Sequence, residues 1–200
     1  MNVFKTVEES YDKIGEEYHN FRDKNKFNSE LEKFTSYLPS SGRILDAGSG
    51  SGIPVAQFLA QRGFDVTGID ISEKMVELAQ KNVPQAIFMK KNMLTLDFPD
   101  EFFDGIICVY SLWHIPRNNH LFIFQNFNRM LKKEGILVIN TGVNESEGLT
   151  DFFGEPMFWS NNSTEKTLEL VKKANLEVLF EGTLIRGNEK QYWIFAKKRD

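Results

Sequence analysis

The feature that most constrains this chain is the stretch of residues 44–52, which reads Ile-Leu-Asp-Ala-Gly-Ser-Gly-Ser-Gly. A short apolar run ends in Asp46, and glycine then stands at every second position from Gly48 to Gly52. Residues 53–62 follow with the pattern of a helix. Glycine lets a backbone approach a ligand closely, and the N-terminus of a helix offers free N–H groups. The stretch therefore predicts a strand, a tight ligand-binding loop and a helix.

Such a loop first suggests a dinucleotide site, whose fingerprint is G-x-G-x-x-G. Here the third glycine comes one residue early, at Gly52, and Ile53 stands where that pattern has Gly or Ala. The carboxylate of Asp46 would also repel a pyrophosphate, whereas it suits a ligand with a positive end, such as S-adenosylmethionine. The pattern of Asp46, Gly48, Gly50 and Gly52 resembles the first motif of the class I S-adenosylmethionine-dependent methyltransferases, acid-x-Gly-x-Gly-x-Gly.

The composition favours one soluble globular domain of 200 residues, 41% of them hydrophobic. A net charge of −4 disfavours a nucleic-acid partner, which would require a basic face. The one cysteine, Cys108, cannot build a disulfide framework, a zinc cluster or an iron–sulfur cluster within the chain. Residues 1–13 carry charges throughout, unlike a signal peptide, and no apolar run is long enough to span a membrane. We expect a cytoplasmic protein without a membrane partner.

Strand and helix patterns alternate through the middle of the chain, which predicts a doubly wound α/β fold with a parallel sheet. Ser72 is placed to cap one of the helices. The predicted strands are residues 43–46, 65–70, 86–90, 102–110 and 135–140, and the predicted helices are residues 53–62, 73–82 and 116–131.

The two ends of the chain depart from this alternation. Apolar stripes predict helices near residues 4–21 and 31–38 at the start. Near the end, a helix at residues 164–174 precedes strands at 177–183 and 191–196, with a hairpin-like link at 186–188. The resemblance implies a Rossmann-like sheet of seven strands, mostly parallel, with a C-terminal antiparallel hairpin. It also implies a single methyltransferase domain, with residues 1–39 as a helical cap and 40–200 as the core.

An acid after the second strand, here Asp70, accepts hydrogen bonds from ribose hydroxyls in such folds. Where the family usually has an acid to accept from the adenine amino group, this chain has Asn92, whose amide oxygen can also accept. The cofactor implied by the resemblance is S-adenosylmethionine. The positions implied to contact it are Tyr18, Asp46, Gly48, Ser49, Gly50, Gly52, Asp70, Ile71, Met75, Asn92, Met93 and Tyr110.

The segment after the fourth strand lines the methyl-transfer site in this family, and it contains His114, the candidate general base. No carboxylate stands at the tip of that strand, so we expect no metal site. His19 and His120 lie in predicted helices and are expected at the surface. Tyr18 and Tyr11 resemble the family's N-terminal lid, and residues 156–160 are expected to form a loop at the acceptor pocket. The candidate acceptor-binding residues are Tyr11, Trp113, Phe158 and Trp159.

These patterns favour methyl transfer from S-adenosylmethionine to a small molecule at an O, N or S atom, without a metal. Two alternatives stay open: a regulatory protein that binds the cofactor without catalysis, and an NAD-dependent oxidoreductase, which Asp46 and Ile53 disfavour. The sequence does not determine the acceptor or the oligomeric state.

The identity of the cofactor is the first testable prediction. In calorimetric titrations, the protein should bind S-adenosylmethionine or S-adenosylhomocysteine in a saturable manner and should not bind NAD. This is expected because Asp46 attracts a cationic ligand and repels a pyrophosphate. Saturable binding of NAD, with no binding of either methionine nucleoside, would contradict the prediction.

Overall fold

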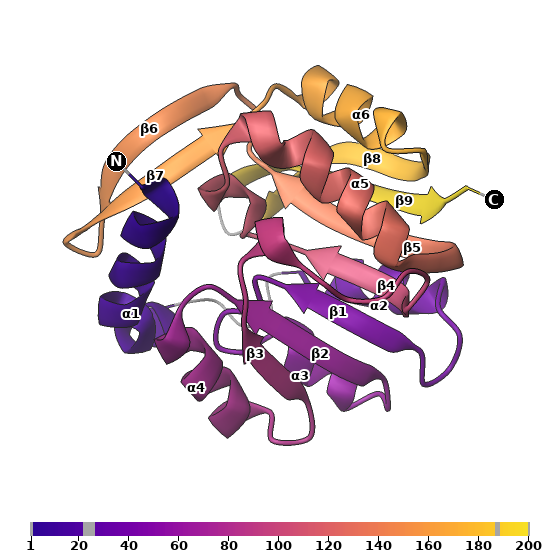
Figure 1. The fold of residues 1–200 in the computed structure, drawn as a ribbon, viewed down its shortest axis with the longest axis horizontal. Coiled ribbons are helices and arrows are strands. Elements are labelled where there is room, and N and C mark those ends of the chain that lie inside the picture. The colour runs from indigo at the N-terminus through magenta and orange to yellow at the C-terminus, as the bar shows by residue number, and fades with distance from the viewer. Residues whose placement is uncertain (1, 22–26, 187–188, 200) are drawn as a thin grey trace.

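A seven-stranded sheet forms the centre of the protein, in a computed structural model that describes residues 2–21, 27–186 and 189–199 (Figure 1). The strand order is β3-β2-β1-β4-β5-β9-β8, and the pairs among the first five strands in this order are parallel. β9 runs antiparallel to both β5 and β8. The strands are β1 (Arg43–Ala47), β2 (Asp65–Asp70), β3 (Ile87–Lys90), β4 (Phe103–Cys108), β5 (Leu131–Thr141), β8 (Leu176–Arg186) and β9 (Glu189–Lys198). This is the predicted fold class.

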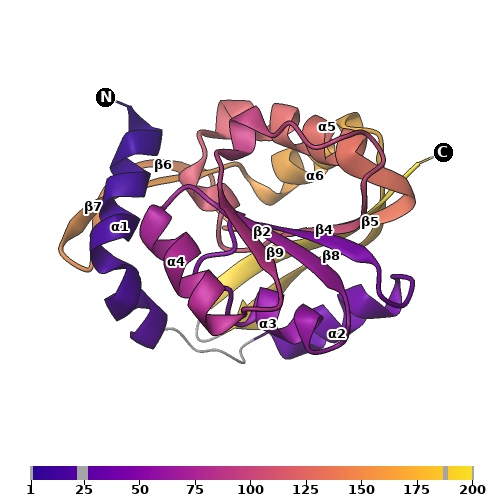
Figure 2. The same ribbon diagram turned by 60° about the horizontal axis from the view of Figure 1, so that its bottom comes forward.

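Side chains alternate between the two faces of the sheet, as the period of a strand requires. Leu45 and Ile106 belong to the apolar cluster on one face, and Ile44 and Ile107 to the cluster on the other. Helices α5 (His120–Met130) and α6 (Thr164–Lys173) cover the first face, while α2 (Asn28–Ser36), α3 (Val55–Ala60) and α4 (Glu73–Asn82) cover the second. Figure 2 shows the sheet between these layers. Burial on both faces explains the continuous apolar runs in the central strands.

Local signals in the sequence place the start of two helices. The Ser72 hydroxyl accepts a hydrogen bond from the Met75 N–H and so caps α4, as predicted. The Ser163 hydroxyl accepts from the Lys166 N–H and caps α6 in the same way. β2 and α4 have the predicted bounds, whereas the helix predicted over 116–131 is a short 3-10 turn (Arg117–Asn119) followed by α5. β5 starts at Leu131, four residues before the predicted start.

A second, two-stranded antiparallel sheet corrects the sequence prediction. Its strands are β6 (Ser146–Phe152) and β7 (Glu155–Asn161), and β7 contains the residues 156–160 that were predicted to form a loop. All but the last residue of β6 are exposed, so this strand lacks the apolar alternation by which a strand is recognised. The predicted link at 186–188 lies partly outside the described residues. No helix in the described ranges is long and apolar enough to cross a membrane.

Helix α1 (Val3–Phe21) lies at the carboxyl ends of the parallel strands, between α4 and the β6–β7 hairpin (Figure 1). Its buried residues Val7 and Ile14 pack against Met157 and Phe158 of β7 in a small apolar cluster. Polar contacts surround this cluster: the Ser10 hydroxyl donates to the Pro156 carbonyl at 2.7 Å. Two segments from opposite ends of the chain thus close one end of the sheet.

The contact between α1 and α4 depends on Asp12. Its Oδ1 accepts from the Ser72 hydroxyl at 2.6 Å and from the Lys74 N–H at 3.2 Å, which adds a negative charge to the N-terminus of α4. Asp12→Ala should lower the free energy of unfolding by about 1–2 kcal/mol and speed hydrogen exchange in α1 more than in the sheet.

Glu9→Ala is the matched control, since Glu9 is an exposed carboxylate of the same helix that pairs with Lys5 one turn away. It should change stability by less than about 0.5 kcal/mol. Equal hydrogen exchange in α1 of the parent and the Asp12→Ala variant would show that Asp12 does not hold this helix.

Candidate functional site

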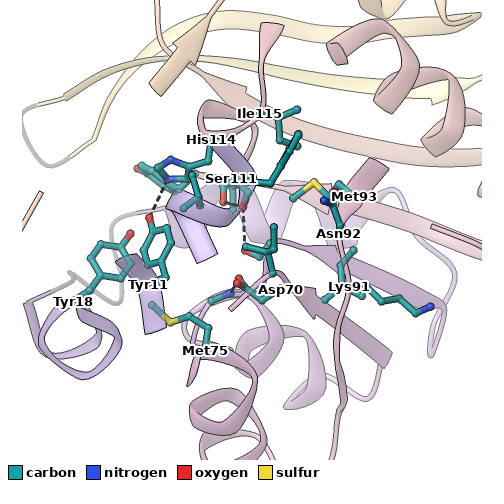
Figure 3. A pocket seen from close by; sticks show the side chains of 18 residues that line it. Tyr11, Tyr18, Asp70, Met75, Lys91, Asn92, Met93, Ser111, His114 and Ile115 are labelled. Carbon is teal, nitrogen blue, oxygen red and sulfur yellow. Dashed lines mark hydrogen bonds between the residues drawn. The ribbon is translucent and has the colours of Figure 1, made fainter. Parts of the chain in front are cut away.

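A pocket opens at the carboxyl ends of β1, β2 and β4, where the strand order reverses direction (Figure 3). This is where open α/β sheets bind ligands. About 690 Å³ of empty space lies in the pocket and its mouth, part of it open to solvent. Its lining is Phe4, Val7, Tyr11, Tyr18, Gly48, Gly50, Ile69, Asp70, Ile71, Met75, Lys91, Asn92, Met93, Val109, Tyr110, Ser111, His114 and Ile115.

The glycine loop is fixed to the neighbouring strand β2. The N–H groups of Gly48 and Ser49 both donate to the Ile69 carbonyl at 2.8 Å. The Gly50 N–H donates to Oδ2 of Asp70 at 2.9 Å. Gly48 and Gly50 have φ values of 79° and 53°, a region that side-chain-bearing residues rarely adopt. Glycine adopts this path without the steric cost that a β-carbon would add.

Asp70 joins the loop to the next helix. Its Oδ1 accepts from the Ser72 N–H at 3.0 Å while Oδ2 holds the loop, so its carboxylate keeps lone pairs for further donors. Loss of hydration raises the pKa of Asp70, and the backbone N–H bonds oppose this shift. An acceptor-only group held in this way fits the two hydroxyls of a ribose.

The glycine loop also contacts the segment after β4. The Ser111 hydroxyl lies 3.0 Å from the Gly48 carbonyl oxygen and 3.1 Å from that of Val109. A β-carbon added to Gly48 would lie only 2.0 Å from Ser111 Oγ. Glycine at position 48 therefore leaves room for the Ser111 side chain as well as for the pocket. Sequence reasoning missed this second reason for the glycine.

The rest of the pocket combines apolar and amide groups, which fits an adenine ring. Ile71, Met75 and Met93 line it as predicted, beside Asn92. The Asn92 side chain departs from expectation, since its Oδ1 already accepts from the Leu94 N–H at 2.9 Å. A second lone pair stays on that oxygen and two hydrogens stay on the amide nitrogen. Together with the accepting carboxylate of Asp70, these hydrogen-bonding groups fit an adenosine-containing cofactor.

Three of the predicted cofactor positions do not line the pocket. Asp46 is buried at the end of β1, 1% exposed, and Ser49 is buried beside Gly68. Gly52 (φ 77°) packs against Val83 and Phe88 instead, which indicates a structural reason for the third glycine. Tyr18 and Tyr110 do line the pocket.

His114 lies at the other end of the pocket, in the 3-10 turn Leu112–His114 that follows β4. Its Nδ1 is 2.9 Å from the Phe158 carbonyl oxygen, which can only accept, so Nδ1 carries the proton. Nε2 is therefore the acceptor in its 2.9 Å contact with the Tyr11 hydroxyl. Burial lowers the pKa of His114 to about 4, and the Phe158 carbonyl opposes this shift. The imidazole is thus a neutral base with its lone pair on Nε2.

Aromatic side chains surround this histidine. The Tyr11 and Tyr18 rings pack edge to face with centroids 5.6 Å apart, and Trp159 lies 4.7 Å from the His114 ring. Of the four predicted acceptor-binding residues, Tyr11 lines the pocket, whereas Trp113, Phe158 and Trp159 lie behind or beside His114.

Comparison with known proteins agrees with this geometry. Residues 45–139 match the family described as methyltransferase domain. YqeM of Bacillus subtilis, named as a methyltransferase, is 36% identical over 126 residues, which cover 60% of this chain and 50% of that protein. A crystal structure of a SAM-dependent methyltransferase from Methanosarcina mazei is 25% identical and has a TM-score of 0.73, covering 82% of this chain and 96% of that one.

The matched segment contains the glycine loop, Asp70 and His114, and the chain resembles SAM-dependent methyltransferases in sequence and fold. Magnesium protoporphyrin IX methyltransferase from Synechocystis, solved with bound SAM, has the same fold, with a TM-score of 0.79 at 17% identity over 99% of this chain and 98% of that one. The chain spans about half the length of the curated relatives it matches.

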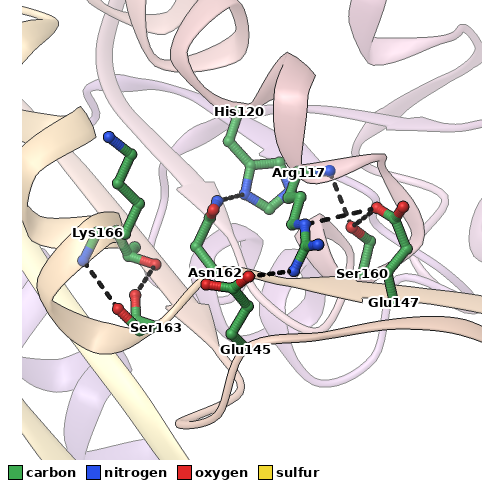
Figure 4. A network of polar contacts seen from close by, with 9 residues as sticks. Arg117, His120, Glu145, Glu147, Ser160, Asn162, Ser163 and Lys166 are labelled. Atoms are coloured by element: carbon green, nitrogen blue, oxygen red, sulfur yellow. Dashed lines mark hydrogen bonds and ion pairs between the residues drawn. The ribbon is translucent and has the colours of Figure 1, made fainter.

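A polar network joins the base of the β6–β7 hairpin to the segment at the start of α5 (Figure 4). The Arg117 N–H donates to the Ser160 hydroxyl at 2.8 Å, and that hydroxyl donates to Glu147 at 2.7 Å. His120 is fully buried, which corrects its expected surface position. Its Nε2–H donates to the Ile115 carbonyl and its Nδ1 accepts from Asn162. The network holds the strand whose Phe158 carbonyl sets the protonation of His114.

His19 is only partly buried, and its Nδ1 contacts the Ser51 hydroxyl of the glycine loop at 2.8 Å. Within the described residues, no group of three or more His, Cys, Asp or Glu side chains is gathered as a metal site would require. Burial and the nearby Asp46 raise the pKa of the Cys108 thiol, so this cysteine is not a thiolate nucleophile near neutral pH.

The low pKa of His114 predicts a dependence of stability on pH. Between about pH 6.5 and pH 4 the unfolded chain binds a proton at His114 that the folded protein does not, so acidification through this window should cost up to about 3 kcal/mol. Urea unfolding from pH 4.5 to 7.5 should show a shallower acid decline for His114→Gln than for the parent. His120 is present in both proteins and cancels in the comparison. Parallel pH curves would contradict the assigned burial of His114.

Proposed function

We propose that the protein transfers the methyl group of S-adenosylmethionine to a hydroxyl of a small-molecule acceptor, without a metal. The observation that carries the proposal is one pocket with two chemically distinct ends. The glycine loop and Asp70 lie at one end, and the neutral His114 with its lone pair toward Tyr11 lies at the other. YqeM, named as a methyltransferase, and the 27-O-demethylrifamycin SV methyltransferase of Amycolatopsis mediterranei are similar in sequence and support the reaction class.

The cofactor, when bound, supplies an electrophilic methyl group on a sulfonium. The chain supplies binding, alignment and exclusion of water. Asp70 accepts from the ribose, Met75 and Met93 pack on the adenine, and Tyr18 with the rest of α1 closes the methionine end. Asp46, buried under the loop, adds a negative charge near the positive end of the cofactor.

His114 accepts the proton of the acceptor hydroxyl. The new O–C bond would form as the bond from the methyl group to the sulfonium sulfur breaks and a neutral thioether leaves. The acceptor oxygen would then be positive and strongly acidic, so even a base with a pKa of about 4 accepts its proton. The low pKa also keeps the imidazole neutral and ready at neutral pH. In this structure the Tyr11 hydroxyl is hydrogen-bonded to Nε2 of His114. The acceptor hydroxyl therefore transfers its proton to Nε2 either after displacing the Tyr11 hydroxyl or through it.

The acceptor is proposed to be a largely apolar or aromatic molecule, because Tyr11 and Tyr18 line this end of the pocket and Phe152 packs against both rings. The net charge of −4 argues against a nucleic-acid acceptor. We also propose that residues 1–39 act as a cap on a core formed by residues 40–200, and that the protein works in the cytoplasm.

Binding by the glycine loop is tested by Gly50→Val. A side chain at φ 53° strains the loop and fills the approach to the ligand, so affinity for S-adenosylhomocysteine should fall at least tenfold in calorimetry. Gly63→Val is the matched control: Gly63 also has a positive φ (82°), but a β-carbon there meets nothing within 4 Å. If both variants bind equally well, the loop is not the cofactor site.

The role of His114 is tested by turnover on one confirmed acceptor, found by screening a panel of small hydroxyl compounds. His114→Gln should lower kcat by about 10²–10⁴ and leave cofactor affinity nearly unchanged. The acid limb of the parent rate should lie near pH 4 rather than near the usual histidine value. A small loss in His114→Gln but a large one in Tyr11→Phe would instead assign the proton to Tyr11.

The same assays decide between the enzyme and its alternative. Binding of the cofactor with no turnover on any acceptor would favour a regulatory protein that binds S-adenosylmethionine without catalysis.

A further inference from the structure

Tyr110 is the residue of the pocket with the most unusual backbone. It follows β4 directly and has a φ of 59°, a region that costs a side-chain-bearing residue free energy because its Cβ crowds the carbonyl oxygen. Of the residues with positive φ that are not glycine, only Tyr110 lines the described pocket. Strained backbone of this kind persists only where surrounding contacts hold it.

Two fully buried amides from the neighbouring strands provide those contacts. Oδ1 of Asn140, in β5, accepts the Tyr110 N–H at 2.7 Å. Nδ2 of Asn140 then donates to Oε1 of Gln191 in β9, at 3.2 Å. The Trp193 indole, which can only donate, also donates to this Oε1 at 3.2 Å and so fixes the orientation of the Gln191 amide.

With its orientation fixed, Gln191 directs Nε2 toward the Tyr110 hydroxyl, to which it donates. Tyr110 is therefore held at both ends, by the backbone N–H and by the phenol. Neither amide was predicted as a site residue. Asn140 lies in β5 and Gln191 in β9, and the sequence pattern of a strand does not reveal the hydrogen bonds of its polar residues.

The left-handed turn at Tyr110 determines where the next four residues lie. It sends Ser111 against Gly48, and the following 3-10 turn, closed by the His114 N–H to the Ser111 carbonyl at 3.1 Å, directs the imidazole toward Phe158. We propose that Asn140 and Gln191 are positioning residues that hold Tyr110 in this conformation and thereby align both the glycine loop and His114. The consequence of this alignment for catalysis rests on the proposed function, whereas the alignment itself is measurable without turnover.

The test is histidine NMR and calorimetry on Asn140→Ala. With Tyr110 released, His114 should leave the Phe158 carbonyl and the Tyr11 hydroxyl, and its pKa should rise from about 4 toward the ordinary value of about 6.5. Affinity for S-adenosylhomocysteine should fall by about tenfold. Gln191→Leu keeps the hydrogen bond from the Tyr110 N–H to Asn140. This variant should shift the His114 pKa in the same direction. It provides the test if Asn140→Ala does not fold.

Asn161→Ala is the matched control. Oδ1 of Asn161 also accepts a backbone N–H, that of Gly142 at 2.9 Å rather than that of Tyr110, and this asparagine is also buried. It should leave the His114 pKa and the cofactor affinity unchanged within about twofold.

A Tyr110→Gly background separates positioning from general destabilisation, because glycine adopts a positive φ without help. In that background Asn140→Ala should have little further effect on cofactor affinity. An unchanged His114 pKa in both Asn140→Ala and Gln191→Leu, or the same tenfold loss in both backgrounds, would overturn the inference. If the parent binds no methionine nucleoside, the proposed function fails, and the histidine titration still decides this inference.

Discussion

The close contact between Ser111 and Gly48 is the constraint on which the rest of the site depends. Ser111 follows β4 and Gly48 follows β1, so the contact joins the segment that carries His114 to the glycine loop. The space is so small that a β-carbon on Gly48 would lie 2.0 Å from Ser111 Oγ. The Ser111 side chain therefore leaves no room for a side chain at position 48. Because the parallel sheet holds β1 and β4, this contact fixes the two halves of the pocket relative to each other.

The opposite wall of the pocket is held much less firmly. Helix α1 buries only Val7, Ser10, Ile14 and Gly15, and exposed ion pairs such as that of Lys13 with Glu155 surround them. Exposed ion pairs contribute little to stability. The free energy that keeps α1 in place is thus a small part of the total, so this helix belongs to the low-stability end of the structure, where lids are found. The sheet side of the pocket is held firmly and helix α1 is held weakly. This arrangement allows a ligand to be enclosed without displacing the groups that align it.

The sequence predicted the parts of this site that depend on local pattern. The helix cap at Ser72, the strand ending in Asp70 and the position of His114 after β4 follow from periodicity, capping chemistry and the family motif. The β6–β7 hairpin was missed because β6 is exposed and polar and Pro156 indicates a loop. The buried position of His120 and the pairing of Asn140 with Gln191 depend on partners 42 and 51 residues away. Such non-local hydrogen bonds leave no periodic signal, and a polar residue inside a strand is indistinguishable by pattern from a solvated one.

The bond between the Ser10 hydroxyl and the Pro156 carbonyl joins residues 146 positions apart in the chain. Helix α1 precedes β5 and the hairpin in the chain, so it is synthesised before the surface on which it docks exists. The order of synthesis and the order of assembly are opposite for this element. During translation the strands that carry the glycine loop and His114 can pair while the pocket is still open on one side. Enclosure of the pocket by α1 is then a late step in the folding of each molecule.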